Sequence, residues 1–161
     1  MLIKAEVEYM RYILPHESCV RSLAATMGIK ASVDAVDAVC RWIRDNIAFD
    51  PEARNFHPCD ILRERKGTCL SASILATSLL RSLGFEEDKV FTIVALHRGE
   101  DPFEATHASL LLLPDGMGMK NKAFIISILP EHIFISTTLS EFLLTNTIIT
   151  IFNDKMAYIP K

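Results

Sequence analysis

The stretch from Cys69 to Leu80 contains no charged residue, although charged residues lie on both sides of it. Thr68 stands directly before this stretch, where a threonine side chain can cap a helix, and Gly84 stands where a glycine can end one. We therefore predict a helix from residue 69 to residue 83. A helix without a charged face is covered on most sides, so the fold has to surround this helix.

Further helices are predicted before this central one. The segment from Glu17 to Met27 is expected to form a helix that ends at Gly28, and residues 58 to 65 a short helix. Ser32 is the expected N-cap of a longer helix. Its apolar residues recur at spacings of three and four and form one stripe, made of Val33, Val36, Cys40, Ile43 and Ile47. Because Cys40 lies within this stripe, core packing is its expected role.

After Gly84 the pattern changes to short apolar segments separated by turns. A capping box at Thr138 predicts one more short helix, which ends at Leu144. The predicted strands cover residues 90–96, 106–113, 123–129, 147–152 and 155–159. Helices come first and antiparallel strands second, which is typical of the α+β class. We expect N-terminal helices, with a central buried helix packed on an antiparallel β-sheet, in a single domain that spans residues 1–161.

Charge and hydropathy exclude two classes of partner. The net charge of −3 and the short basic cluster at residues 63–66 argue against binding to nucleic acid. No apolar run reaches the roughly 18 residues that a membrane span needs. The first twelve residues carry charges where a signal peptide would be apolar. We therefore expect a cytoplasmic protein that does not enter a membrane.

The four cysteines, at positions 19, 40, 59 and 69, contain no C-x-x-C pair. In a reducing compartment we expect all four to be free thiols, each explained by packing, by a metal or by catalysis. A zinc site needs four convergent ligands, and only His57 and Cys59 lie close together in the sequence. A structural zinc site is kept as a further hypothesis beside the functions considered below, but we expect no metal and no cofactor.

Cys69 is the best candidate for a reactive thiol. It begins the central helix, where unpaired backbone N–H groups create a positive potential, and Arg63, Arg65 and Lys66 precede it; both features favour a thiolate. A thiol nucleophile also needs a base, which is normally a histidine. His107 opens a predicted strand and is the best placed base, with His97 as the runner-up. The simplest alternative is that Cys69 is only a small buried side chain.

The order of several short motifs resembles the transglutaminase-like superfamily, which is related to papain and shares a cysteine–histidine–aspartate core. The resemblance covers roughly residues 33 to 113. It implies a papain/transglutaminase-like core, with Cys69 as the nucleophile and His107 as the base. The matching residues are Trp42, Ile47, Phe49, Asp50, Leu62, Arg65, Gly67, Cys69, Leu80, Arg81, Leu83, Gly84, and the pair His107-Ala108.

The sequence departs from this family at the third catalytic position. The family has an aspartate before a proline at the end of the next strand, whereas this chain has Leu129 before Pro130. Folding the strands about the turn at residues 114–116 brings His107 opposite residues 127 to 129, of which only Ser127 is polar. We therefore predict Ser127 as an atypical third residue, which can orient an imidazole but carries no charge.

Two functions remain open. In the first, a Cys69–His107 dyad carries out cysteine-dependent acyl transfer or amide hydrolysis, as a peptidase, an amidase or a transglutaminase-like enzyme, on a peptide, a protein or a small amide. In the second, the chain is a catalytically inactive transglutaminase-like module for binding or scaffolding. The acidic segment from residue 98 to residue 105 is expected to border the site. The sequence assigns no oligomeric state.

Overall fold

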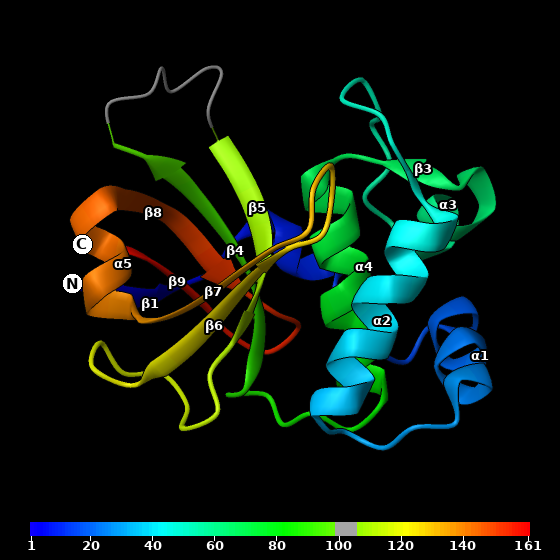
Figure 1. The fold of residues 1–161 in the computed structure, drawn as a ribbon, viewed down its shortest axis with the longest axis horizontal. Helices are drawn as coiled ribbons and strands as arrows, with labels where there is room; N and C mark the ends of the chain where they lie inside the picture. Colours follow the sequence, from blue (N-terminus) through cyan, green and yellow to red (C-terminus); the bar gives the residue numbers. More distant parts are fainter. Residues whose placement is uncertain (99–105) are drawn as a thin grey trace.

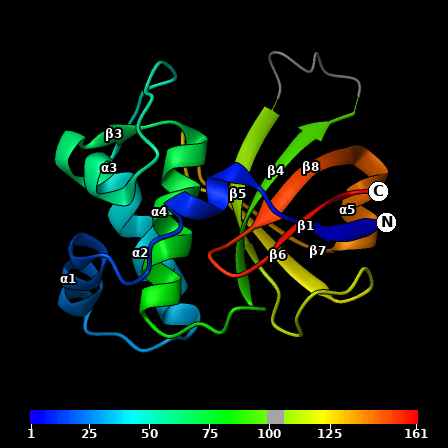
Figure 2. The same ribbon diagram turned by 180° about the vertical axis from the view of Figure 1, so that it is seen from behind.

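The computed structural model describes residues 1–98 and 106–161. Its main feature is a seven-stranded antiparallel sheet with the strand order β1-β9-β8-β4-β5-β6-β7 (Figure 1). The strands are β1 (Leu2–Ala5), β4 (Val90–His97), β5 (Thr106–Leu112), β6 (Lys122–Ser127), β7 (Ile133–Thr138), β8 (Asn146–Phe152) and β9 (Ala157–Pro160). Because β1 pairs with β9, the two chain ends lie side by side (Figure 2).

The helices divide between the two sides of this sheet. Helices α1 to α4 lie together on one side, and α5 lies beyond the other face (Figure 1). The helices are the 3-10 helix η1 (Glu8–Tyr12), α1 (Ser18–Met27), α2 (Val33–Asn46), α3 (Pro58–Glu64), α4 (Cys69–Ser82) and α5 (Leu139–Thr145). Predicted helices and caps agree with this structure, since Ser32 caps α2 and Gly28 ends α1 with a left-handed φ of 62°. The α+β class is confirmed.

Helix α4 is the buried central helix that its uncharged sequence predicts. Every residue from Ser71 to Leu80 is buried. Its polar side chains have hydrogen-bond partners inside the fold: the Oγ1 atoms of Thr77 and Thr92 lie 2.8 Å apart and join α4 to β4. At the other end of α4, the guanidinium of Arg81 donates to the carboxylate of Asp154 at 2.7 Å. These contacts hold α4 in one position against the sheet, because a buried polar group without a partner would be costly.

Each face of the sheet has its own apolar core. Leu110 of β5 packs with Leu75 and Leu79 of α4. Leu111, the next residue, packs on the opposite face with Phe142 of α5. Successive side chains of a strand point to opposite faces, so His107 belongs to the same face as Leu111.

Four strands of the structure were not predicted from the sequence. These are the two outermost strands of the sheet, β1 and β7, and the short parallel pair β2 (Ala48–Phe49) and β3 (Lys66–Gly67). Within residues 1–98 and 106–161, no helix is both long enough and apolar enough to cross a bilayer.

The expectation of four free thiols is wrong for two of the cysteines. Cys19 and Cys59 form a disulfide that joins α1 to α3, while Cys40 and Cys69 are free. The physical reason is that the fold brings together two segments 40 residues apart, with a Cα–Cα distance of 5.7 Å that a disulfide can bridge. Cys40 is buried as predicted, and burial raises the pKa of its thiol to about 12.

Candidate active site

Cys69 is the first residue of α4, and a capping box fixes the start of this helix. The Ser71 N–H donates to Thr68 Oγ1 at 3.1 Å, and the Thr68 N–H donates to Ser71 Oγ at 3.2 Å. The Cys69 side chain is half-buried, whereas the other free thiol, Cys40, is almost fully enclosed. Cys69 is thus the more accessible of the two free thiols.

The segment before Cys69 is held by the parallel pair β2 and β3. The Ala48 N–H donates to the Arg65 carbonyl and the Asp50 N–H donates to the Gly67 carbonyl, both at 2.9 Å. Arg65 has a positive φ of 58° and ends α3, which turns the chain toward β3. These contacts place the end of α2 beside the loop that leads into α4, so residues far apart in the sequence position Cys69.

Gly67 has to be a glycine because the start of α4 lies against it. A Cβ atom at this position would lie 2.6 Å from the Cβ of Ser71, closer than real Cβ atoms approach. The same Ser71 hydroxyl donates to the carbonyl of Asn55 at 2.8 Å, and the Asn55 amide donates to the Lys66 carbonyl at 2.7 Å. The buried residue Asn55 was not predicted as part of the site. It links the loop at residues 50–58 to Lys66, before Cys69, and to Ser71, after it.

The first turn of α4 leaves two backbone donors available. An α-helix cannot pair its first N–H groups internally. Here the N–H of Ser71 is bonded to Thr68 Oγ1 and that of Ala72 to the Thr68 carbonyl. The N–H groups of Cys69 and Leu70 have no hydrogen-bond partner among residues 1–98 and 106–161. Two adjacent N–H groups next to a thiol can hold an oxyanion.

The three basic residues before Cys69 have partners of their own. Arg63 pairs with Asp60 at 2.8 Å, and the Lys66 ammonium lies 3.7 Å from the Asp50 carboxylate. The Arg65 guanidinium lies over the Trp42 ring, 5.1 Å from its centroid. The positive potential at Cys69 therefore comes mainly from the helix start rather than from these side chains.

His107 lies near the start of β5, opposite Ala95 of β4. Its Nε2 atom lies 2.5 Å from Ser127 Oγ of β6, so the structure brings together the predicted second and third residues of the site. Its Nδ1 atom has no hydrogen-bond partner in the described part of the chain. Burial lowers the pKa of His107, which favours the neutral imidazole that a base requires.

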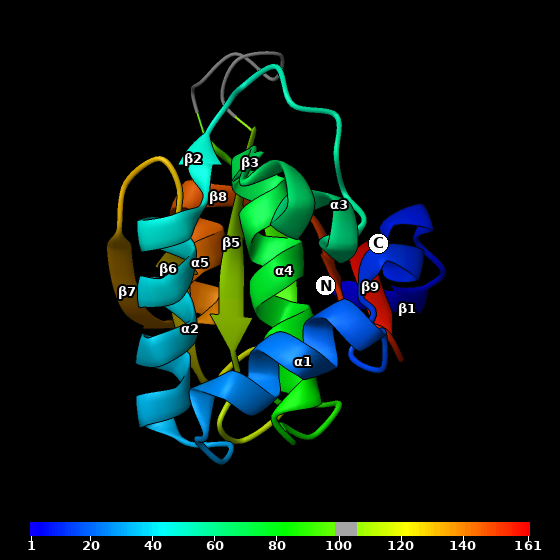
Figure 3. The same ribbon diagram turned by 90° about the vertical axis from the view of Figure 1, so that its right-hand side faces the viewer.

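Cys69 and His107 lie toward the same end of the molecule. Figures 1 and 3 both show α4 and β5 beginning at the end where the chain leaves β3, and running side by side from there. No hydrogen bond joins the Cys69 sulfur to the His107 ring among the described residues. The alternation along β5 assigns His107 to the face of the sheet that carries α5, whereas α4 covers the other face, so the pairing of these two residues in catalysis stays a prediction.

A cavity of about 330 Å³ adjoins His107 on the face of the sheet that carries α5. Its lining residues come from the five strands β4 to β8 and from α5, and six of the eleven are apolar. Its described lining residues are Ile93, Ala95, His97, His107, Ser109, Ile125, Ser127, Ile133, Ile135, Phe142 and Asn146. Apolar walls with a few convergent polar groups are typical of a pocket for a small ligand or a side chain. The runner-up base His97 also lies here.

Leu129 is a core residue and offers no carboxylate to the site. It is 5% exposed and packs in the cluster that α2 and α4 share. The residue that bonds His107 is Ser127, the last residue of β6. The predicted acidic border from residue 98 to residue 105 lies almost wholly in residues 99–105, outside the described residues.

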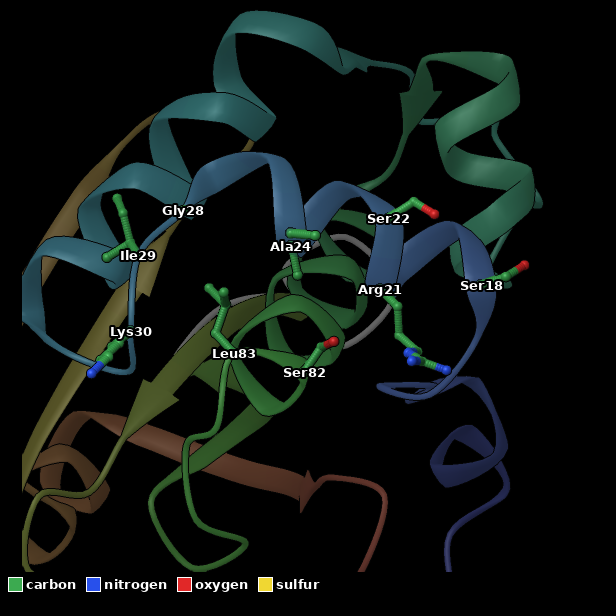
Figure 4. A pocket seen from close by; sticks show the side chains of 10 residues that line it. Ser18, Arg21, Ser22, Ala24, Gly28, Ile29, Lys30, Ser82 and Leu83 are labelled. Carbon is green, nitrogen blue, oxygen red and sulfur yellow. The ribbon is translucent and has the colours of Figure 1, made fainter.

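Two other features of the molecule include neither Cys69 nor His107. A more open cavity of about 650 Å³ lies between α1 and the end of α4, and Figure 4 shows the ten side chains that line it, including Arg21, Ser82 and Leu83. None of these lining residues is a cysteine or a histidine. The second feature is a group of donor atoms from Glu17, His57 and Cys59, beside the disulfide.

Several solved structures share this fold. LapG from Legionella pneumophila superposes with a TM-score of 0.63 at 14% identity, covering 89% of this chain and 87% of that chain. Its calcium-bound form gives a TM-score of 0.59 at 14% identity, with 88% and 74% covered. A candidate cysteine protease from Cytophaga hutchinsonii gives 0.53 at 18% identity, covering 97% of this chain and 54% of that one.

Sequence comparison gives the family. Among curated protein sequences, none matches this chain. The family model of the transglutaminase-like superfamily matches residues 21–110, which is more than half of the chain and includes both Cys69 and His107. The motifs, the fold and this match agree, and the chain belongs to the transglutaminase-like superfamily.

Proposed function

We propose that this protein is a cysteine-dependent enzyme that cleaves or transfers acyl groups, with Cys69 as the nucleophile and His107 as the base. The observation that carries the proposal is the hydrogen bond between His107 and Ser127, at the end of the molecule where Cys69 begins α4 (Figure 3). When the neutral imidazole carries its proton on Nε2 and donates it to the Ser127 hydroxyl, Nδ1 is left free to accept a proton from a thiol.

The first half of the reaction forms a thioester. His107 takes the proton of the Cys69 thiol, and the sulfur attacks the carbonyl carbon of the substrate, which forms a new S–C bond. The negative charge on the carbonyl oxygen is stabilised by the free N–H groups of Cys69 and Leu70. When the C–N or C–O bond breaks, the leaving group takes the proton back from His107.

The second half regenerates the thiol. Water or an amine attacks the thioester carbon, His107 takes a proton from it, and the S–C bond breaks to restore Cys69. Water gives a peptidase or an amidase, and an amine gives a transferase. The substrate that we propose is a peptide, a protein or a small amide, with an apolar group in the cavity beside His107.

An inactive binding module is the second candidate, and the observation in its favour is Leu129. An aspartate in this place would stabilise the imidazolium that forms during the reaction, and a buried leucine cannot. Ser127 orients His107 but adds no charge. A module of this kind would keep the fold and bind a peptide or a protein without chemistry at Cys69.

The two candidates are separated by trapping the acyl intermediate. The protein is incubated with a panel of activated esters and peptide amides, and the intact mass is recorded over time. We expect an acyl adduct on Cys69 that forms and then disappears by hydrolysis. Cys69→Ala should abolish the adduct and Cys40→Ala should keep it. The enzyme proposal would be contradicted if the adduct formed equally in Cys69→Ala, or if neither the wild type nor any variant formed an adduct.

A further inference from the structure

We propose that the four side chains Glu17, Cys19, His57 and Cys59 form a zinc site when the Cys19–Cys59 disulfide is reduced. The site lies between the start of α1 and the start of α3 and includes neither Cys69 nor His107. It therefore goes beyond the proposed acyl-transfer activity and does not depend on it.

The donor atoms already lie close together. Those of Glu17, His57 and Cys59 all lie within 4.8 Å of one another, and the Cys19 sulfur is bonded to the Cys59 sulfur. Zinc–ligand bonds of about 2.0–2.3 Å in a tetrahedron place the ligand atoms roughly 3.3–3.8 Å apart. For Glu17, His57 and Cys59 this is a small movement of the side chains, and the Cys19 sulfur, which is outside that group of three, has to turn toward the same point once the two sulfurs part.

The chemistry of the four donors suits zinc. Two thiolates with an imidazole and a carboxylate form a donor set that zinc accepts in four-coordinate sites. The Glu17 carboxylate is exposed and has no ion pair or hydrogen bond among the described residues, so no competing partner holds it.

His57 caps the start of α3 from within this group of donors. Its Nδ1 atom accepts a hydrogen bond from the Cys59 backbone N–H at 3.1 Å. Binding of the metal through this nitrogen replaces that cap bond at the start of α3. The expected loss of one hydrogen bond is small beside the affinity of a structural zinc site.

The disulfide has to be reduced before the zinc site can form. A dithiol reductant transfers two electrons and two protons to the S–S bond, which breaks to give two thiols, and the reductant becomes a disulfide. Zinc then displaces the two thiol protons and binds the thiolates. In a reducing compartment, which the sequence predicts for this protein, the metal would take over from the disulfide in joining α1 to α3.

The experiment is a metal titration of the full chain, with and without reduction. A phosphine is the reductant because dithiols compete for zinc. Cobalt is added first because a tetrahedral thiolate site gives strong visible and near-ultraviolet bands, and zinc is then added to displace it. We expect one metal per chain in the reduced protein and none at this site in the oxidised protein.

Variants locate the site. Cys19→Ser and Cys59→Ser should remove the thiolate–cobalt bands, and Glu17→Ala and His57→Ala should weaken metal binding at least tenfold while leaving the circular dichroism spectrum unchanged. The control is the double variant Cys40→Ala/Cys69→Ala, which should bind as wild type does, because Cys69 with His107 is the other thiol–imidazole pair. The proposal is overturned if the reduced protein binds no metal, if the oxidised protein binds equally well, or if the control loses the site.

Discussion

Ser127 Oγ lies 2.5 Å from His107 Nε2, across the neighbouring strands β5 and β6. In this superfamily the sequence motif places an aspartate two residues further along the chain, where Leu129 stands and is buried in the core. A hydroxyl can hold the imidazole in one orientation, but it cannot offset the positive charge that the ring gains when it takes a proton. The proposed activity of Cys69 should therefore be sensitive to what occupies position 127.

The role of Ser127 is tested by adding and by removing its polar group. Ser127→Ala should slow acyl-enzyme formation by about five- to tenfold, the effect of losing one hydrogen bond to the base. Ser127→Asp should instead raise the rate by at least about tenfold, because a carboxylate stabilises the imidazolium. The measurement is the rate of adduct formation on Cys69. Ser109, which lines the same cavity but does not bond His107, provides the control: Ser109→Ala should change the rate less than twofold.

The burial of His107 predicts how stability depends on pH. Because burial lowers its pKa in the folded state, the unfolded chain, in which a histidine titrates near 6.5, binds the proton more readily. Stability should therefore fall as the pH drops below about 6.5, toward the lowered pKa of the folded state. His107→Gln should reduce this loss when the melting temperature is followed from pH 7.5 to pH 5. His132→Gln, at an exposed position, should keep the wild-type profile; equal profiles for all three proteins would refute the prediction.

The close approach of Gly67 to Ser71 predicts a specific effect of a single methyl group. In Gly67→Ala the new Cβ would lie 2.6 Å from the Ser71 Cβ, so the first turn of α4 must move. We expect a loss of about 1–3 kcal/mol in the free energy of unfolding and slower modification of Cys69. Gly28→Ala is the matched control. It adds the same methyl group to a left-handed position with no atom within 4 Å, so it should cost about 1 kcal/mol and leave Cys69 unaffected.

The disulfide predicts a thiol count and a change in stability. Denatured protein that has not been reduced should titrate two free thiols per chain, those of Cys40 and Cys69, and reduced protein should titrate four. Without reductant or metal, Cys19→Ser should lose about 2–4 kcal/mol of stability, because the open chain gains entropy when it unfolds. Urea unfolding measures this change. Cys40→Ser is the comparison variant, because its loss of stability comes from a buried core position and not from a disulfide. Four thiols before reduction would contradict the disulfide.

The helices could be predicted because each carries its own local signals. Ser32 and Thr68 act as N-caps in the structure, and the apolar stripe of α2 and the uncharged run of α4 both face the core. The contact between His107 and Ser127 could also be predicted, since a hairpin turn limits which residues of two strands lie near each other; the observed register makes it a diagonal contact, two residues from the position directly opposite His107. Signals of this kind lie within a few residues of what they determine.

The features that were missed depend on contacts between distant segments. Strand β1 is four residues long and pairs with β9 at the other end of the chain, so nothing near it in the sequence indicates a strand. Strand β7 is mostly exposed and shows no buried alternation. The disulfide joins residues 40 positions apart, and Asn55 binds groups in two other segments. These contacts depend on how distant elements pack together, and the spacing of residues along the chain does not indicate them.

The most direct test of the proposed Cys69–His107 pair is the rate at which iodoacetamide labels each free cysteine at neutral pH, resolved by mass spectrometry of peptides. In the native oxidised protein we predict that Cys69 is labelled rapidly and Cys40 hardly at all, because Cys40 is buried and its pKa is raised to about 12. His107→Ala should slow labelling of Cys69 at least tenfold, while His132→Ala should leave it unchanged. If Cys69 is labelled at the same rate with and without His107, the two residues do not act as a pair, and the account of this protein as a cysteine enzyme is contradicted.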